Sequence, residues 1–294
     1  MNDISFIGLG KMGTPMALNL LKKKFNLTIY DLNFKNYDNF KKHNVKLASG
    51  ISDLTEKNSV FITMLPDGKA LQKLVLGKNG LINSIKKNSI FMDCSSVDYG
   101  TTVRVSKALN SAGVKFLDAP VSGGVVGAEN ASLTIMVGGN INGYRKVKKI
   151  LSCMGKKVIH VGNSGAGQIV KACNNMMLGI NMIGVCEAFL LAKKFGINQK
   201  KFFEITSISS GSSWAMLNHL PFKGIINSTA ANNKFKPGYA AKLILKDLNI
   251  SQEMSKKINF NTILGKKALE LYKSFCNQDK KNLDYAAIIK IFDR

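Results

Sequence analysis

A glycine-rich turn near the start of the chain has the residue spacing of a phosphate-binding loop. The string GLGKMG follows the apolar run Ile4–Ile7 and precedes a stretch with helical spacing. In such a turn the first glycine allows a sharp bend, the second lets backbone amides approach a pyrophosphate, and the third lets the helix pack closely on the strand. The string alone is a weak signal, but its place between a strand and a helix N-terminus predicts a dinucleotide site. The cofactor-binding residues of this turn are Gly8, Leu9, Gly10, Lys11, Met12 and Gly13.

An acidic residue stands where the adenine ribose of a dinucleotide is expected. Asp31 ends the second apolar run, 31 − 8 = 23 residues after Gly8. A carboxylate at this place accepts hydrogen bonds from the ribose hydroxyls of NAD. It repels the 2′-phosphate of NADP, because two unit charges about 4 Å apart interact by about 4 kcal/mol at an effective dielectric constant of about 20. The sequence therefore predicts NAD, although Lys35 on the same loop could reach a phosphate.

Alcohol oxidation by a dinucleotide also needs a base for the hydroxyl proton. The three histidines, His43, His160 and His219, lie far apart and outside any motif, so they predict neither this base nor a metal site. A lysine is then the candidate. It acts as a base at neutral pH only where burial or nearby positive charge lowers the pKa of its ammonium group.

The elements that must position these residues follow an alternating pattern up to about residue 160. Apolar β-rich runs alternate with helical stretches such as Met12–Lys24 and Thr101–Ala112. This pattern predicts an α/β fold with a doubly wound, mostly parallel sheet of the Rossmann type. The expected strands are Ile4–Gly8, Leu27–Asp31, Val60–Leu65, Ile90–Cys94, Lys115–Ala119, Leu133–Gly138 and Val158–Val161.

Helical periodicity dominates after Gly162. One long helix is expected from about 167 to 195, and residues at steps of three or four share one of its faces, first polar and then apolar. These residues are Lys171, Asn175, Leu178, Met182, Val185 and Phe189. We therefore predict an NAD-binding Rossmann domain over 1–162 and an all-helical domain over 163–294.

The composition is that of a globular enzyme rather than of a nucleic-acid-binding protein. The 294 residues carry a net charge of +24, but arginine occurs only three times, so lysine supplies 42 − 3 = 39 of the cations. Proteins that bind nucleic acids rely on arginine and gather their basic residues on one face. Here the lysines occur as doublets and triplets along the chain, which predicts a solvated surface and no nucleic-acid partner.

Cysteine usage and apolar patterning predict a cytoplasmic protein. Five cysteines without a CxxC pair indicate reduced thiols. Residues 1–13 do not resemble a signal peptide. The most membrane-like segment, Met176–Ala192, is interrupted by Asn181 and Glu187 and is short for a bilayer. We expect a buried helix there and no membrane partner.

Four segments spread over nearly the whole chain resemble the β-hydroxyacid dehydrogenase family. They are Gly8–Leu20 (GLGKMGTPMALNL), Asp118–Gly139 (DAPVSGGVVGAENASLTIMVGG), Gly162–Asn175 (GNSGAGQIVKACNN) and Lys246–Ser251 (KDLNIS). Ser210–Tyr239 looks like the 3-hydroxyisobutyrate branch in particular. The resemblance implies a Rossmann domain followed by a helical domain, an active site between them, and a homodimer or homotetramer.

The resemblance also implies roles for individual residues. Lys171 matches the catalytic lysine of the family, and Asn175 would bond the reacting oxygen or orient that lysine. Asn174 points elsewhere and is a weaker substrate-binding candidate. It stands with Asn175 where the longer 6-phosphogluconate enzymes carry His-Asn, which argues against that branch.

Further residues are expected around the substrate and the cofactor. Ser122 and the amides of Gly123 and Gly124 would bind the substrate carboxylate, and Trp214 and Tyr239 would wall its methyl group. The remaining expected residues are Leu65, Pro66, Ser96 and Lys246 at the cofactor, and Asp247, which would fix Lys246 or the surroundings of Lys171.

The resemblance thus implies NAD-dependent oxidation of a small hydroxy acid, 3-hydroxyisobutyrate, to methylmalonate semialdehyde, a step of valine breakdown. Reduction of tartronate or succinate semialdehyde is the alternative within the family, because those substrates also pair a carboxylate with a nearby carbonyl or alcohol carbon. A basic binding protein that keeps the fold without turnover is the alternative of another class.

Overall fold

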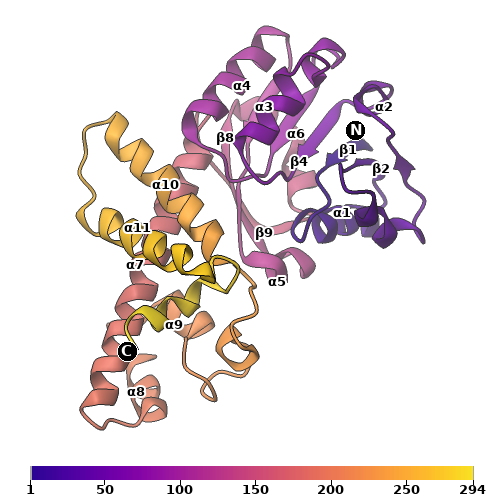
Figure 1. The fold of residues 1–294 in the computed structure, drawn as a ribbon. Helices are drawn as coiled ribbons and strands as arrows, with labels where there is room; N and C mark the ends of the chain where they lie inside the picture. Colours follow the sequence, from indigo (N-terminus) through magenta and orange to yellow (C-terminus); the bar gives the residue numbers. More distant parts are fainter. Residues whose placement is uncertain (1, 294) are drawn as a thin grey trace. The chain divides into compact units, whose positions relative to one another are not determined.

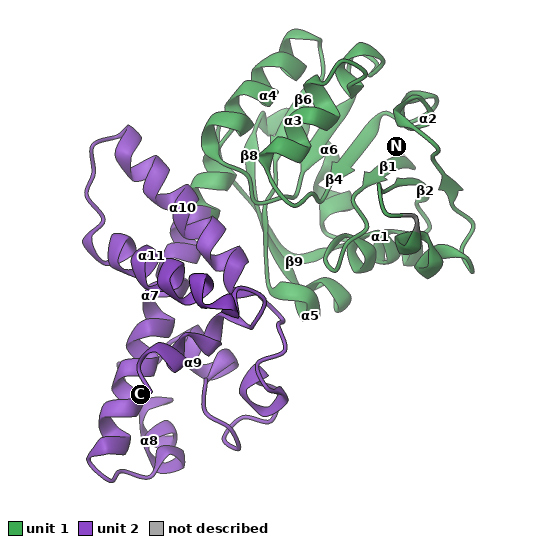
Figure 2. Cartoon of the chain, viewed as in Figure 1, with its two compact units in different colours: residues 1–171 green, residues 172–294 purple. Residues whose placement is uncertain are grey.

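The computed structural model describes residues 2–293. The chain divides into two compact units, residues 1–171 and 172–294, here called the sheet unit and the helical unit (Figure 2). The sequence pattern placed the division at 162/163, where the last strand ends. The two divisions differ because the first turns of the following helix are hydrogen-bonded to the sheet.

The sheet unit is built on a nine-stranded sheet among the described residues (Figure 1). Its strand order is β3-β2-β1-β4-β5-β6-β8-β7, with β9 beside β8. The strands from β3 to β6 are parallel, β8 is antiparallel to β6 and β7, and β9 is parallel to β8. The predicted doubly wound, mostly parallel sheet is confirmed. Its strands are β1 (Asp3–Ile7), β2 (Asn26–Tyr30), β3 (Lys46–Leu47), β4 (Val60–Thr63), β5 (Ile90–Asp93), β6 (Lys115–Asp118), β7 (Val121–Ser122), β8 (Leu133–Gly139) and β9 (Gly155–Gly162).

Helices bury both faces of the central strands β1, β4, β5 and β6, which explains why these are nearly continuous apolar runs. Ile4 and Phe6 face one core, and Ile7 faces the other. In the second core, Phe61 and Phe91 of neighbouring strands stack with ring centroids 6.2 Å apart. The helices of this unit are α1 (Gly13–Lys22), α2 (Ile51–Thr55), α3 (Gly68–Leu76), α4 (Tyr99–Ser111), α5 (Gly124–Glu129) and α6 (Ile141–Leu151), with short 3₁₀ turns at Phe34–Phe40 and Leu81–Asn83.

The helical unit packs its helices around an apolar core that includes Met182, Leu248, Tyr272 and Phe275. No strand occurs among its described residues, in agreement with the predicted all-helical C-terminal region. Its helices are α7 (Ala166–Lys194), whose first turns belong to the sheet unit, α8 (Gln199–Thr206), α9 (Trp214–His219), α10 (Ala241–Lys257) and α11 (Ile263–Phe275), with shorter helical turns at Ala230–Asn233, Cys276–Lys280 and Tyr285–Ile291.

Helix α7 is the long helix that the sequence predicted from 167 to 195. By length and composition it could cross a membrane, a test that core helices of globular proteins also pass. Its Met182 and Phe189 are buried in the helical unit, whereas Met177 and Leu191 are exposed. α7 therefore serves as a core helix with an apolar face left uncovered within one chain.

Candidate functional site

The glycine turn after β1 has a geometry that only glycine allows at two positions. Gly8 has a φ of +93°, and a Cβ there would lie 2.3 Å from the carbonyl oxygen of Met64. A Cβ on Gly13 would lie 1.9 Å from the carbonyl oxygen of Gly8. The strand, the turn and α1 can therefore approach this closely only with glycine at both places.

The same turn fits the pyrophosphate of a dinucleotide. A Cβ on Gly10 would meet no atom within 4 Å, so its exposed backbone borders open space. Helix α1 begins directly after Met12 with no side chain capping its first turn. Uncapped amides at a helix start are available to an anion.

Asp31 fixes the turn to the end of β2. Its Oδ2 accepts a 2.6 Å hydrogen bond from the amide of Leu9, and its Oδ1 accepts a 2.7 Å bond from the amide of Asn33. Sequence analysis expected contacts to ribose and did not foresee this structural task. A carboxylate oxygen can accept more than one hydrogen bond, so the two tasks are compatible.

A buried carboxyl organises the ends of β4 and β5. Asp93 Oδ1 accepts hydrogen bonds from the hydroxyls of Thr63 (2.7 Å) and Ser95 (2.6 Å). Burial raises the pKa of the Asp93 carboxyl to about 6. The hydroxyl oxygen of Ser95 in turn accepts a 2.8 Å bond from the amide of Leu65. One carboxyl thus holds both strand ends.

Three of the expected cofactor residues lie beside this network. Leu65 and Pro66 follow β4, and Ser96 follows β5, the neighbouring parallel strand. They share with Gly8 the carboxyl edge of the sheet, where doubly wound folds bind ligands.

Ser122 ends the short strand β7 and is partly buried. Gly123 and Gly124, which follow it, are exposed and have φ values of +134° and +64°. Consecutive positive φ values favour glycine, and a Cβ on Gly124 would meet no atom within 4 Å. The expected role of this turn in binding a carboxylate stays a prediction.

Asp118 holds the start of α7 to the end of β6. Its carboxylate accepts hydrogen bonds from the amides of Gly165 (2.7 Å) and Gln168 (3.1 Å). Burial raises the pKa of this carboxyl, and the amide bonds oppose that effect. Lys171, one turn beyond Gln168, is partly buried. The sheet therefore fixes the helix turn that carries Lys171.

The helical unit gathers a second set of expected residues around Asp247. Its Oδ2 accepts 2.5 Å hydrogen bonds from Asn175 Nδ2 and from the hydroxyl of Tyr239. Lys246 Nζ lies 3.7 Å from Oδ1. Asn174 Nδ2 donates to Asn175 Oδ1 at 3.0 Å. The paired asparagines, the tyrosine and the Lys-Asp pair are therefore one connected cluster.

Trp214 is joined to this cluster only through other aromatic rings. The ring centroids of Trp214 and His219 lie 4.9 Å apart, and those of His219 and Tyr285 lie 5.2 Å apart. The ring of Tyr285 in turn lies 5.5 Å from that of Tyr239. Trp214 itself is 54% exposed. Burial lowers the pKa of His219.

Sequence reasoning missed the positioning residues Asp93, Asp118 and Gln168. Asp93 and Asp118 each end an apolar strand, IFMD and KFLD, and a buried acidic residue at a strand end was a readable signal. Nothing in the pattern around Gln168 distinguished it from a surface glutamine.

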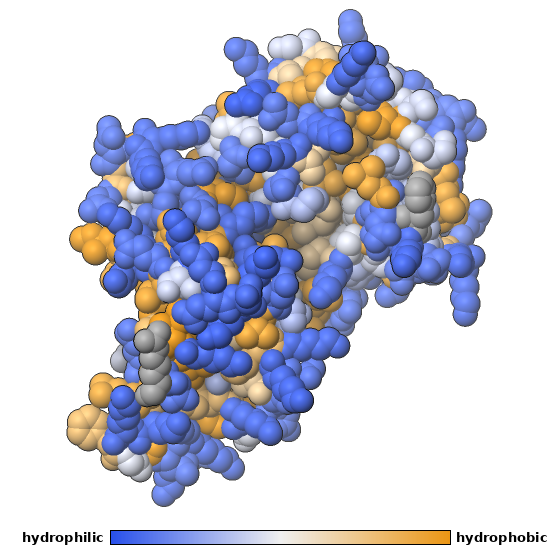
Figure 3. Space-filling model, viewed as in Figure 1, coloured by the Kyte–Doolittle hydropathy of each residue, from blue (hydrophilic) through white to orange (hydrophobic). Residues whose placement is uncertain are grey.

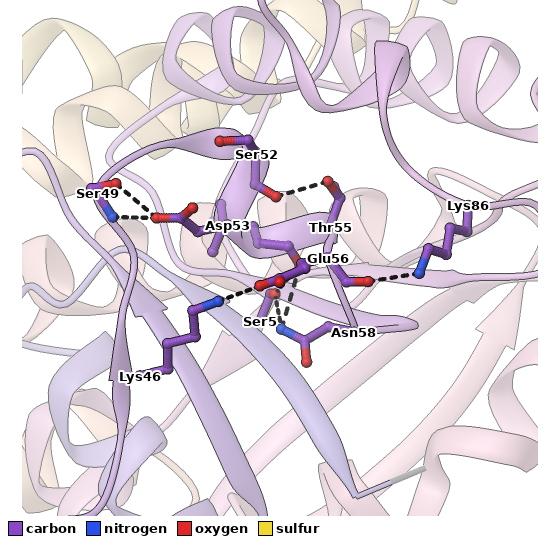
Figure 4. Close-up of polar contacts among 10 residues, drawn as sticks. Ser5, Lys46, Ser49, Ser52, Asp53, Thr55, Glu56, Asn58 and Lys86 are labelled. Carbon is purple, nitrogen blue, oxygen red and sulfur yellow. Dashed lines mark hydrogen bonds and ion pairs between the residues drawn. The ribbon is translucent and has the colours of Figure 1, made fainter.

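A cavity of about 240 Å³ lies at the opposite edge of the sheet, where β1, β2 and β4 begin. Its lining groups are largely satisfied by one another. Lys46 pairs with Glu56, and Asn58 donates to the hydroxyl of Ser5 (Figure 4). In a parallel sheet this edge is not where ligands bind.

Hydrophilic side chains cover much of the face in Figure 3. Among residues 2–293, no group of three or more His, Cys, Asp or Glu side chains could hold a metal ion.

Two family models match almost all of the chain. Residues 3–162 match the NAD binding domain of 6-phosphogluconate dehydrogenase, and residues 165–292 match the NAD-binding domain of NADP-dependent 3-hydroxyisobutyrate dehydrogenase. NAD is therefore the cofactor, and the glycine turn described above fits it.

Individual relatives cover the full length. The mitochondrial 3-hydroxyisobutyrate dehydrogenase of Rattus norvegicus is 35% identical over 98% of this chain and 86% of its own. An NAD-dependent L-serine dehydrogenase of Pseudomonas aeruginosa is also 35% identical, over 100% of this chain and 98% of its own. A structure of Mycobacterium tuberculosis 3-hydroxyisobutyrate dehydrogenase with L-serine superposes with a TM-score of 0.93 at 33% identity, covering 100% of both chains.

Proposed function

The chain belongs to the 3-hydroxyisobutyrate dehydrogenase family of NAD-dependent hydroxyacid dehydrogenases, and we propose that its own substrate is 3-hydroxyisobutyrate. The reaction converts the primary alcohol and NAD⁺ into methylmalonate semialdehyde, NADH and a proton. The observation that carries the proposal is the hydrogen-bonded cluster of Asn175, Tyr239 and Asp247, in which Asn175 stands four residues after Lys171 on the same helix, α7.

Lys171 takes the proton of the substrate hydroxyl in this proposal. Bound NAD⁺ supplies the hydride acceptor. Asn175 orients the reacting oxygen or the lysine. Its Oδ1 accepts a hydrogen bond from Asn174, and its Nδ2 donates to Asp247 and to the hydroxyl of Tyr239. The amide therefore has one fixed orientation, with one acceptor site of Oδ1 to spare. A group held in this way loses little entropy when the substrate binds.

The substrate carboxylate is assigned to Ser122 and the amides of Gly123 and Gly124. Both glycines have positive φ, and a Cβ on Gly124 would meet no atom within 4 Å, which leaves room for an anion against the backbone. Trp214 and Tyr239 remain our candidates for the wall around the methyl group, with the hydroxyl of Tyr239 committed to Asp247.

L-serine is the second candidate substrate. One full-length relative is named an NAD-dependent L-serine dehydrogenase, and the similar Mycobacterium tuberculosis structure contains L-serine. L-serine and 3-hydroxyisobutyrate both carry a CH₂OH group next to the carbon that bears the carboxylate. L-serine carries an ammonium group where 3-hydroxyisobutyrate carries a methyl group, and the polarity of the pocket would discriminate between the two.

Initial rates decide between these substrates. The purified enzyme is assayed with both enantiomers of 3-hydroxyisobutyrate and with L-serine, and in the reverse direction with tartronate and succinate semialdehydes, each with the NAD and the NADP couple. We expect the highest kcat/KM for (S)-3-hydroxyisobutyrate with NAD. A higher value for L-serine, or for either semialdehyde, would overturn the substrate assignment.

We further propose a homo-oligomer. The helical unit exposes large apolar side chains from the end of α7 to the residues just after α8, and exposed apolar surface of this kind is typical of interfaces. These side chains are Leu191, Phe195, Ile197, Ile205 and Ile208. Light scattering of the wild type should give a multiple of 32.1 kDa. A monomer would contradict the proposal, and the variant Ile208→Glu should shift the mass downward.

A further inference from the structure

Gln168 joins the sheet to the first turn of α7 through its side chain. It is 2% exposed. Its Nε2 donates a 2.8 Å hydrogen bond to the carbonyl oxygen of Ser95, and its Oε1 accepts a 3.1 Å bond from the amide of Val97. The nitrogen and the oxygen of the Gln168 side-chain amide are therefore both hydrogen-bonded to the backbone, one on each side of Ser96.

The segment held by Gln168 is fixed from the other side as well. The hydroxyl of Ser95 donates to Asp93 and accepts from the amide of Leu65. The residues assigned to the cofactor at this edge, Leu65 and Ser96, therefore belong to the same hydrogen-bonded network as Gln168.

Gln168 is equally well fixed on its own helix. Its amide donates to Asp118, which also accepts from the amide of Gly165. Lys171 follows one turn later, so the position of its backbone relative to Ser96 is set by the contacts of Gln168. All of these residues belong to the sheet unit.

We propose that Gln168 is a positioning residue that sets the distance between the cofactor segment 95–97 and the proton-accepting lysine. The idea rests on the proposed function, because it takes Lys171 as the acid–base group and Ser96 as a cofactor residue. Hydride and proton leave the same CH–OH group, so the groups that receive them must keep a fixed separation. A misplacement of about 1 Å can cost about 100-fold in rate.

The substitution Gln168→Met tests the proposal, because methionine has a similar volume and can form neither backbone bond. Gln252→Met is the matched control. Gln252 is also a buried glutamine, in α10, and it accepts a 2.9 Å bond from the hydroxyl of Thr262 within the helical unit. Both variants should lose thermal stability, and only Gln168→Met should lose rate per folded molecule.

Three measurements are made on each full-length variant: kcat with its primary deuterium isotope effect, NADH affinity by fluorescence, and amide hydrogen exchange at Val97. For Gln168→Met we expect kcat to fall about 10- to 100-fold and the isotope effect to move closer to its intrinsic value. The NADH dissociation constant should rise only a few-fold, and the amide of Val97 should exchange faster. For Gln252→Met, kcat and Val97 exchange should stay within about twofold of the wild type.

An unchanged kcat and isotope effect in Gln168→Met, with only a lower Tm, would reduce Gln168 to a stabilising residue and overturn the proposal. Unchanged exchange at Val97 would also overturn it. Failure of the proposed function looks different, because the wild type itself would then oxidise none of the hydroxy acids, whereas the exchange and NADH-binding results would still report on Gln168.

Discussion

The side-chain amide of Asn175 donates a 2.5 Å hydrogen bond to the buried carboxylate of Asp247. The hydroxyl of Tyr239 reaches the same carboxylate oxygen, and Lys246 approaches the other. Asn175, expected from the sequence at the reacting group, and Lys246, expected at the cofactor, are thus both in contact with one acidic residue of α10. Asp247 therefore acts through its neighbours, as a positioning residue for both.

The first prediction follows from this arrangement. Asp247→Asn removes the charge that Asn175, Tyr239 and Lys246 share. Tyr239→Phe leaves that charge in place and removes the bond that the hydroxyl donates to Asp247 and the weaker one that it accepts from Asn175. Hydrogen bonds to charged groups contribute about 1.5–3 kcal/mol, so we expect kcat to fall at least tenfold in Asp247→Asn and less in Tyr239→Phe. Because the two residues share a partner, the double variant should lose less than the sum of the single losses. Strict additivity in kcat would contradict this coupling.

The second prediction concerns the acid–base group. Lys171→Ala should lower turnover by about 10²–10⁴, because general acid–base catalysis contributes about that much. NADH affinity, measured by fluorescence titration, should change little. Lys194→Ala is the control, since Lys194 is an exposed lysine at the other end of the same helix. Near-normal turnover in Lys171→Ala would refute the role of Lys171.

Local signals in the sequence were sufficient to predict the sheet unit. Its predicted strands all overlap observed ones, because a strand buried on both faces must be an apolar run. The short strands β3 (Lys46–Leu47) and β7 (Val121–Ser122) were missed, since two residues carry no readable period. The reversal of β8 was also not predicted, because strand direction depends on the connection and not on the run itself.

The site was predictable where a residue acts through its own type and spacing. The glycines of the turn are an example, since Gly8 and Gly13 are required by backbone contacts that the motif implies. Gln168 acts through partners far away in the chain, such as Ser95 and Val97. Such pairs have no local pattern, so only the folded structure reveals them.

The third prediction concerns the choice between NAD and NADP. Asp31→Asn keeps an oxygen acceptor for one of the two backbone amides that Asp31 binds, those of Leu9 and Asn33, and removes the charge that repels a 2′-phosphate. We expect the ratio of kcat/KM for NAD to that for NADP to fall at least tenfold. Adding Lys35→Ala should then reduce the remaining NADP activity if that lysine contacts the phosphate. An unchanged ratio in Asp31→Asn would assign the preference to other residues.

The fourth prediction concerns stability and pH, and it rests on Asp93. Burial raises the pKa of its carboxyl to about 6, above the 3.8 of an ordinary aspartate. The folded protein therefore binds this proton more tightly than the unfolded chain does. It follows that the contribution of this group to the free energy of unfolding is complete below about pH 4 and is lost as the pH rises through about 6. A shift of about two pKa units corresponds to about 3 kcal/mol.

Asp93→Asn removes this titration and keeps an oxygen acceptor for the hydroxyls of Thr63 and Ser95. Urea denaturation of the wild type and the variant from pH 4 to pH 7 measures the effect. The quantity compared is the free energy of unfolding of the variant minus that of the wild type. We expect this difference to increase by up to about 3 kcal/mol from pH 4 to pH 7, whatever its value at pH 4. Asp53→Asn, at a half-buried carboxylate that is bonded to Ser49 and lies outside this network, is the control and should not reproduce this increase. A constant difference between wild type and Asp93→Asn would show that Asp93 has the same proton affinity in the folded and unfolded chains.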